Sequence, residues 1–170
     1  GDIANLFREM SDREKGNELI ERLSHVAYDR TVFDAAREEQ KNSFKGYNSI
    51  EKAVLTYIMI SQSFNAARSS FSKGGYASTE LYHQDMLDNL PGVYERLAHV
   101  KIFNVDALDL LECYVDNEKV FAFLDPPYRH DLRGKNANKI YKCELSEIQQ
   151  IRLLKIIRNA KAKILLCGYK

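Results

Sequence analysis

Four consecutive residues, Asp125-Pro126-Pro127-Tyr128, combine side chains that could act together on an aromatic amine. Consecutive prolines fix φ and remove two backbone N–H donors, which leaves carbonyl oxygens that only accept hydrogen bonds. Asp125 adds a carboxylate acceptor, and Tyr128 adds a flat face on which a planar ring can stack. Two neighbouring acceptors match the two N–H bonds of a primary amine. Such bonding would draw the nitrogen toward tetrahedral geometry and aim its lone pair at an electrophile. The alternative is structural: a strand ended by a Pro-Pro turn, with Asp125 satisfying local N–H groups.

The surrounding pattern predicts that these residues follow a buried strand. Residues 119–124 form a near-continuous apolar run, typical of a parallel strand. Further strands are expected over residues 100–105 and 163–167, with helices over 107–114 and 146–159 between them. This alternation predicts an α/β fold with a parallel sheet and crossover helices. Because ligands bind beyond the carboxyl ends of such strands, the position of Asp125 suits a functional site.

The first hundred residues have helical patterns instead. Apolar residues recur at helical spacing from Ile3 to Met10 and from Leu19 to Ala27, and a third helix is plausible over residues 31–40. Asn48 and Glu51 indicate the start of a helix whose apolar face is expected to run as far as Phe64. A polar loop over residues 69–75 precedes two more helices, over 81–90 and from Pro91 onward.

Composition and charge narrow the class of protein. The chain has 170 residues, of which 45% are hydrophobic and 29% charged, so it is of single-domain size and is neither disordered nor a repeat protein. The net charge of +1 is segregated: residues 86–128 carry −5 and residues 129–170 carry +8. This balance argues against a protein coated in nucleic acid, but it permits one basic docking face. A solvated basic helix and loop is the alternative.

Cysteine usage and hydropathy predict a cytoplasmic protein. The three cysteines are far apart, with no C-x-x-C pair, which argues against a disulfide framework or a zinc site. No apolar run approaches the roughly 18 residues that cross a bilayer, and the first residues do not resemble a signal peptide.

The Asp-Pro-Pro-Tyr segment at the end of an apolar strand resembles the catalytic motif of S-adenosylmethionine-dependent DNA methyltransferases that modify amino groups. Its surroundings are similar to the Dam-like, adenine-specific branch: a basic loop, Tyr141, a Ser-capped helix rich in leucine, and a strand ending in Cys167-Gly168-Tyr169. Upstream, residues 63–68 and 74–76 are similar to the family's Phe-Asn-Gly-x-x-Arg…Gly-x-Phe segment, with Ala66 in place of the glycine.

The resemblance implies a partial Rossmann-like methyltransferase sheet with a helical target-recognition insertion. Residues 1–40 would flank the sheet, 41–99 would form the recognition block, and 100–170 would form the catalytic part. The chain would transfer a methyl group from S-adenosylmethionine to the exocyclic amine of a flipped-out adenine in double-stranded DNA, as in restriction-modification.

The resemblance also implies roles for individual residues. Asp125, Pro126, Pro127 and Tyr128 would hold the flipped adenine. Asp106 would bind the adenine ring of the cofactor, although an Asp at this position is equally typical of a helix N-cap. DNA contacts would come from the following residues: Phe64, Asn65, Arg68, Arg129, Arg133, Lys135 and Lys139. For the loop over residues 129–139 the alternative is a solvated segment, and for residues 64–68 it is a buried Phe and an Asn that ends a helix.

One family feature is absent. The Dam-like family has a Phe-x-Gly-x-Gly turn that approaches the cofactor's methionine portion, and this chain has no Gly-x-Gly anywhere. The start of the sequence resembles the helix that follows the family's second strand. We therefore expect a fragment of a larger methyltransferase that lacks the N-terminal part and is inactive alone. It should bind S-adenosylmethionine weakly or not at all by itself and could self-associate through exposed sheet edges.

Two other functions remain open from the sequence. The same tetrapeptide serves methyl transfer to the exocyclic amine of cytosine. A chain without the cofactor turn could also be a non-catalytic nucleic-acid-binding relic or one subunit of a split enzyme.

Overall fold

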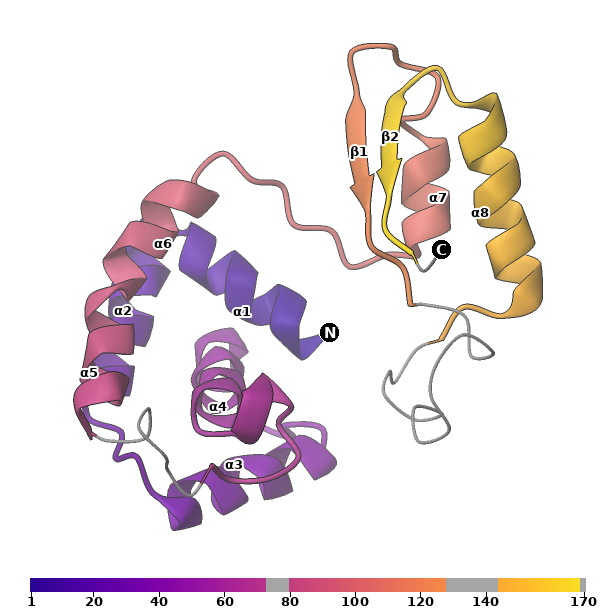
Figure 1. Ribbon diagram of the computed structural model, residues 1–170. Helices are drawn as coiled ribbons and strands as arrows, with labels where there is room; N and C mark the ends of the chain where they lie inside the picture. Colours follow the sequence, from indigo (N-terminus) through magenta and orange to yellow (C-terminus); the bar gives the residue numbers. More distant parts are fainter. Residues whose placement is uncertain (73–79, 128–143, 169–170) are drawn as a thin grey trace. The chain divides into compact units, whose positions relative to one another are not determined.

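The computed structural model describes residues 1–72, 80–127 and 144–168 and divides the chain into two compact units, Gly1–Asn104 and Val105–Lys170 (Figure 1). The first unit is helical and the second is α/β. Residues 1–40 and 41–99 belong to the same unit, and their separate functional roles stay a prediction. Within the described residues, every helix falls short of the length and apolar character that a bilayer crossing requires.

Helices of the first unit surround α4. The elements are α1 (Asp2–Ser11), α2 (Arg13–Ser24), α3 (Arg30–Lys41), α4 (Ser49–Ser61), the short 3₁₀ helix η1 (Phe64–Ala66), α5 (Glu80–Asp88) and α6 (Leu90–Leu97). Helix α4 packs against α1, α2 and α3, because its apolar residues are distributed around the helix rather than along one stripe. The largest side chains that this packing buries completely include Leu19, Leu23, Phe33 and Met59.

The predicted helix starts are confirmed. Asn48 and Glu51 form a capping box at α4, in which each side chain accepts a hydrogen bond from the other residue's backbone N–H. Pro91 lies in the first turn of α6, where its missing N–H costs nothing. In α1, however, only part of the apolar stripe is used: Leu6 and Met10 are buried, whereas Ile3 and Phe7 are exposed.

The expected extension of the α4 apolar face to Phe64 is wrong. Helix α4 ends at Ser61, and Phe64 lies in the following turn with 63% of its surface exposed. The turn places Asn65, Ala66 and Arg68 in the left-handed region, with φ of 51°, 54° and 58°. It is closed by the Arg68 N–H, which donates to Ser63 Oγ at 2.9 Å, and by the Phe64 N–H, which donates to the Ser70 carbonyl at 3.1 Å.

Ala66→Gly is expected to stabilise the first unit by about 1 kcal/mol, because left-handed backbone costs a residue with a Cβ about 1–2 kcal/mol, offset in part by the greater freedom of unfolded glycine. Ala67 provides a matched control, since it is an exposed neighbour with ordinary helical angles (φ −74°, ψ −9°). Ala67→Gly should be neutral or destabilising. Urea unfolding followed by circular dichroism measures both, and an equal response of the two alanines would contradict the assignment of strain to residue 66.

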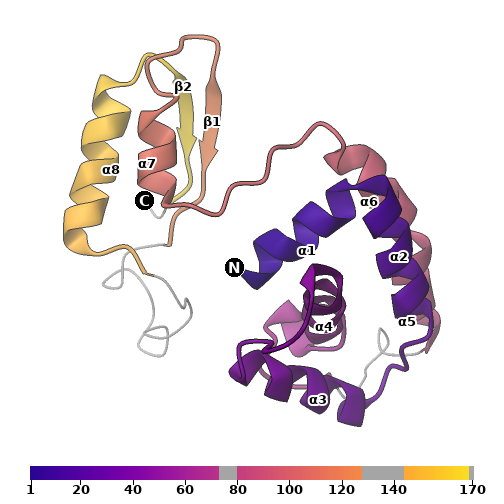
Figure 2. The same ribbon diagram turned by 180° about the vertical axis from the view of Figure 1, so that it is seen from behind.

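The second unit is a two-stranded parallel sheet with two helices on one face. It contains α7 (Ala107–Glu112), β1 (Phe121–Leu124), α8 (Glu147–Asn159) and β2 (Lys163–Leu166). Strands β1 and β2 pair with Phe121 opposite Lys163 and Leu124 opposite Leu166. Both helices lie on the same side of the strands in the two views (Figures 1 and 2). Two of the three predicted strands are confirmed, and so is the predicted crossover helix, which Ser146 and Gln149 start with a capping box.

The predicted strand over residues 100–105 is wrong. This segment is not a strand, and Val100, Phe103 and Val105 are exposed. A strand exists only when its N–H and C=O groups pair with a neighbour, and no described segment pairs with this one. The observed fold is therefore α/β with a sheet smaller than the sequence predicts.

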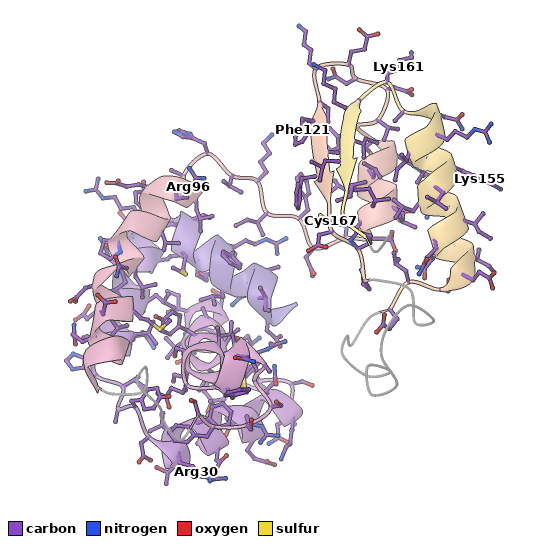
Figure 3. All side chains as sticks on the ribbon, in the orientation of Figure 1. Arg30, Arg96, Phe121, Lys155, Lys161 and Cys167 are labelled. Atoms are coloured by element: carbon purple, nitrogen blue, oxygen red, sulfur yellow. The ribbon has the colours of Figure 1, made fainter. Side chains whose placement is uncertain are left out.

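Among the described residues of the second unit, only one face of the sheet is covered. Ala122 and Leu124 pack against the α7 and α8 cluster, whereas Phe121 and Phe123 on the opposite face are each 62% exposed. Figure 3 shows Phe121 on the side of β1 away from both helices. Parallel sheets are usually covered on both faces, so the apolar pattern of β1 predicts more burial than this unit provides.

Candidate active site

The candidate site begins where β1 ends. Leu124 is the last residue of the strand, and Asp125, Pro126 and Pro127 follow it directly. The Cys167 N–H donates to the Leu124 carbonyl at 2.8 Å, so the carboxyl ends of the two parallel strands are tied together beside Asp125. Figure 3 labels Cys167 at this end of β2. The candidate residues therefore follow directly on a strand end that is held in place by hydrogen bonding.

Asp125 is exposed, and the two prolines are half-buried. No hydrogen bond to the Asp125 carboxylate is present among the residues that the structure describes. The structural alternative, in which Asp125 satisfies nearby N–H groups, stays a prediction, because the first N–H groups after the two prolines belong to residues outside the described part of the chain. Because proline has no N–H, the segment after Asp125 offers acceptors without competing donors.

A cavity of about 290 Å³ opens next to this strand end, within the second unit. Its lining includes Ala107, Leu108 and Leu111 from α7 and Leu153 from α8. Asp125, Pro126 and Pro127 form its edge. Its volume is just below the roughly 300–1,000 Å³ of typical small-molecule sites, and its walls are apolar. The cavity therefore suits a small uncharged group rather than a charged one.

Asp106 caps the helix that forms one cavity wall. Its Oδ1 atom accepts hydrogen bonds from the N–H groups of Leu108 at 2.8 Å and Asp109 at 3.4 Å. The N-cap interpretation of Asp106 is confirmed. Since Ala107 and Leu108 follow directly, this cap also determines where α7 begins to line the cavity.

Asp106→Ala should destabilise the second unit by about 1 kcal/mol through loss of the cap, whereas Asp106→Asn should stay within a few tenths of wild type because asparagine caps equally well. Hydrogen exchange of the α7 amides and urea unfolding measure the difference. If the Asn variant is as unstable as the Ala variant, the capping explanation fails.

Arg152 joins the two helices beside the cavity. Its guanidinium donates to Glu112 at 3.1 and 2.7 Å and to Asp109 at 2.7 Å. These hydrogen bonds, first to Glu112 and then to Asp109, raise the pKa of Arg152 above its ordinary value. Sequence reasoning missed this residue. The two acidic side chains on α7 have helical i, i+3 spacing, but nothing local indicates that their partner lies 40 residues away.

The predicted DNA-contacting residues Phe64, Asn65 and Arg68 come together in the turn after α4, in the first unit. Phe64 and Asn65 are exposed and Arg68 is half-buried, so the interpretation of Phe64 as a core residue is wrong. The fully buried Gln62 holds the base of this turn, because its Nε2 donates to the Ala27 carbonyl at 2.8 Å.

Several predicted site residues lie outside the described residues. They are Tyr128, Arg129, Arg133, Lys135 and Lys139, together with Tyr141. The residues that the structure does describe bring Asp125, Pro126 and Pro127 together with the capped helix of Asp106 around one cavity.

Comparison with protein families gives one match. The family model described as D12 class N6 adenine-specific DNA methyltransferase matches residues 2–167, which includes both units and the whole candidate site. No curated protein and no solved structure gives a significant match.

Proposed function

The chain belongs to the D12 class N6 adenine-specific DNA methyltransferase family, and from this premise we propose that residues 125–128 carry out methyl transfer to the exocyclic amine of an adenine flipped out of double-stranded DNA. The observation that carries the proposal is the position of Asp125, Pro126 and Pro127, at the carboxyl end of a parallel strand and at the edge of an apolar cavity. This is where α/β sheets bind their ligands.

The described residues supply the acceptors that the reaction needs. The Asp125 carboxylate and the Pro126 carbonyl each accept one N–H of the adenine amine. With both protons held, the nitrogen lone pair is withdrawn from the ring and points toward the methyl donor. No strong base is required, because the nitrogen loses its proton readily once it carries the new methyl group. Catalysis by these residues is thus orientation plus hydrogen bonding.

Tyr128 completes the site as a stacking surface for the flipped base. The exocyclic amine is paired inside a duplex, so the base must leave the helix before Asp125 can reach it. An extruded base loses its stacking neighbours, and a tyrosine face replaces part of that interaction.

The cavity fits the adenine portion of S-adenosylmethionine. Its apolar walls suit a planar ring, and Ala107 and Leu108 of α7 would pack against that ring. Asp106 stands at the start of the same helix, where its carboxylate could accept a hydrogen bond from the ring's amino group while Oδ1 caps α7. When bound, S-adenosylmethionine supplies the electrophilic methyl group.

DNA contacts would come from two separate segments of the sequence. Phe64, Asn65 and Arg68 present an exposed turn in the helical unit. Phosphate contacts around the extruded nucleotide would come from the basic loop after Tyr128, whose residues are Arg129, Arg133, Lys135 and Lys139.

The test is direct methyl transfer. The chain is incubated with duplex DNA and S-adenosylmethionine carrying a labelled methyl group, and the DNA is digested to nucleosides for mass spectrometry. Labelled N6-methyladenine is the product expected of a chain with a complete cofactor pocket. Duplex binding without label is the result expected if, as the sequence predicts, the pocket lacks its N-terminal part. Labelled N4-methylcytosine would show instead that the target base is cytosine. A chain that transfers no label, binds no S-adenosylmethionine by calorimetry and binds no duplex would overturn the proposal.

A further inference from the structure

We propose that Arg152 is a positioning residue that holds α7 in register against α8 and so keeps the adenine-binding cavity open to its observed width. The cavity part of this inference rests on the proposed function; the part that concerns α7 does not.

Helix α7 depends on its neighbours for its position. It has six residues, fewer than a helix needs to be stable in water by itself. Helix α8 has thirteen residues and a complete capping box. Helix α8 is thus the more stable of the two. Contacts to it help to position α7, together with the hydrogen bonds that the Val115 carbonyl accepts from the N–H groups of Lys161 and Ala162 at 2.8 and 2.9 Å.

Two kinds of contact join the helices. Leu108 and Leu111 pack against Leu153 and Ile156 in a small buried cluster. Such apolar packing is non-directional and by itself specifies the register of the two helices less strictly than hydrogen bonds do. The Arg152 guanidinium instead has fixed geometry: it bonds both oxygens of Glu112 and also one oxygen of Asp109. A bidentate fork of this kind adds geometric specificity to the interface.

The ion cluster lies on the same helix segments as the cavity walls. Arg152 precedes Leu153, which lines the cavity from α8. Asp109 and Glu112 alternate along α7 with Leu108 and Leu111, which line it from α7. A shift of α7 along α8 would therefore change the shape of the cavity. Loss of the Arg152 side chain should therefore change the shape of the cavity.

Global stability should change little. All three side chains are partly exposed, at 39% for Arg152, 65% for Asp109 and 48% for Glu112. Solvent screens such pairs, which contribute little to the free energy of unfolding. The expected consequence is local loosening of α7 rather than unfolding of the unit.

The experiment compares Arg152→Met, which keeps an alkyl stem and removes the charge, with Arg152→Lys and with the control Arg158→Met. Arg158 is an exposed arginine on α8 with no ion pair among the described residues. The first measurement is hydrogen exchange of the amides that α7 and its end protect, those of Leu110, Tyr114 and Val115. The second is the Kd of S-adenosylmethionine by calorimetry.

Arg152→Met should speed exchange of these amides by about tenfold and raise the Kd about fivefold, with the thermal midpoint nearly unchanged. Arg152→Lys should restore part of both effects, and Arg158→Met should change neither. Unchanged exchange in Arg152→Met overturns the inference. Faster exchange with an unchanged Kd overturns its cavity part. If the wild-type chain binds no S-adenosylmethionine, the cavity part fails with the proposed function, and the exchange rates alone decide whether Arg152 positions α7.

Discussion

Replacing Asp125 with alanine should reduce the rate of methyl transfer to DNA by about 10²–10³-fold or more, the range measured when one preorganised hydrogen-bonding group is removed from an active site. The carboxylate is the only charged acceptor in the described part of the strand-end segment. Without it, one amine proton has no partner and the nitrogen lone pair stays delocalised in the ring. Asp125→Asn should lose less activity, because its amide oxygen still accepts one hydrogen bond.

Folding should survive the change at Asp125. The side chain is exposed and has no hydrogen bond to the described residues, so its removal leaves the β1–β2 pairing intact. Asp116→Ala is the matched control, since Asp116 is an exposed aspartate of the same unit that lies outside the candidate site. Initial rates with labelled S-adenosylmethionine and unfolding curves measured on both variants separate chemistry from stability. Full activity in Asp125→Ala would rule out the mechanism proposed here.

Phe33→Ala should destabilise the helical unit by about 3–5 kcal/mol, the usual cost of truncating a buried aromatic side chain. Phe33 is completely buried. Its ring lies 5.8 Å from the Phe71 ring between centroids, and the Arg37 guanidinium lies 5.8 Å from its centroid. The loss is a large part of the roughly 5–15 kcal/mol that holds a typical domain folded.

Phe33→Ala should also disturb the turn that contains Phe64. Phe71 contacts Phe33 and forms an isolated bridge with Ser63 at the base of that turn. DNA affinity should therefore fall together with stability. Phe7→Ala is the control, because Phe7 is substantially exposed and its truncation leaves only a small cavity. Urea unfolding by circular dichroism measures both variants, and equal losses would show that burial does not determine the effect.

Local signals in the sequence are sufficient for helix starts. Asn48 with Glu51 and Ser146 with Gln149 place an acceptor and a reciprocal partner three residues apart, and each pair caps a helix in the structure. Because both residues of a capping box lie within one helical turn, its formation depends little on distant residues.

Pairing and burial could not be predicted in the same way. The segment over residues 100–105 has the composition of a strand, but a strand also needs a partner, which composition does not specify. Phe64 continues the apolar spacing of α4, yet the chain leaves the helix after Ser61 and turns through three left-handed residues. In both cases the local pattern is correct and the tertiary context decides the outcome.

Part of the candidate site can be predicted from local sequence, and part of it depends on tertiary packing. The chemistry that we propose for residues 125–128 is predicted by four letters of sequence. The cavity beside them is not, because Ala107, Leu111 and Leu153 are ordinary apolar residues that meet only after folding. Asp106 illustrates the limit: the same position predicts a cap or a ligand contact, and a carboxylate has two oxygens with which to do both.

The uncovered face of the sheet has a calorimetric consequence. Unfolding raises heat capacity mainly because apolar surface becomes hydrated. The side chains of Phe121 and Phe123 are already largely in water when the second unit is folded, so they add little to that increment. The second unit should consequently have a smaller heat-capacity change per residue than a sheet covered on both faces. Its stability curve should be correspondingly flat, with a slow loss of structure on heating and little tendency to unfold in the cold.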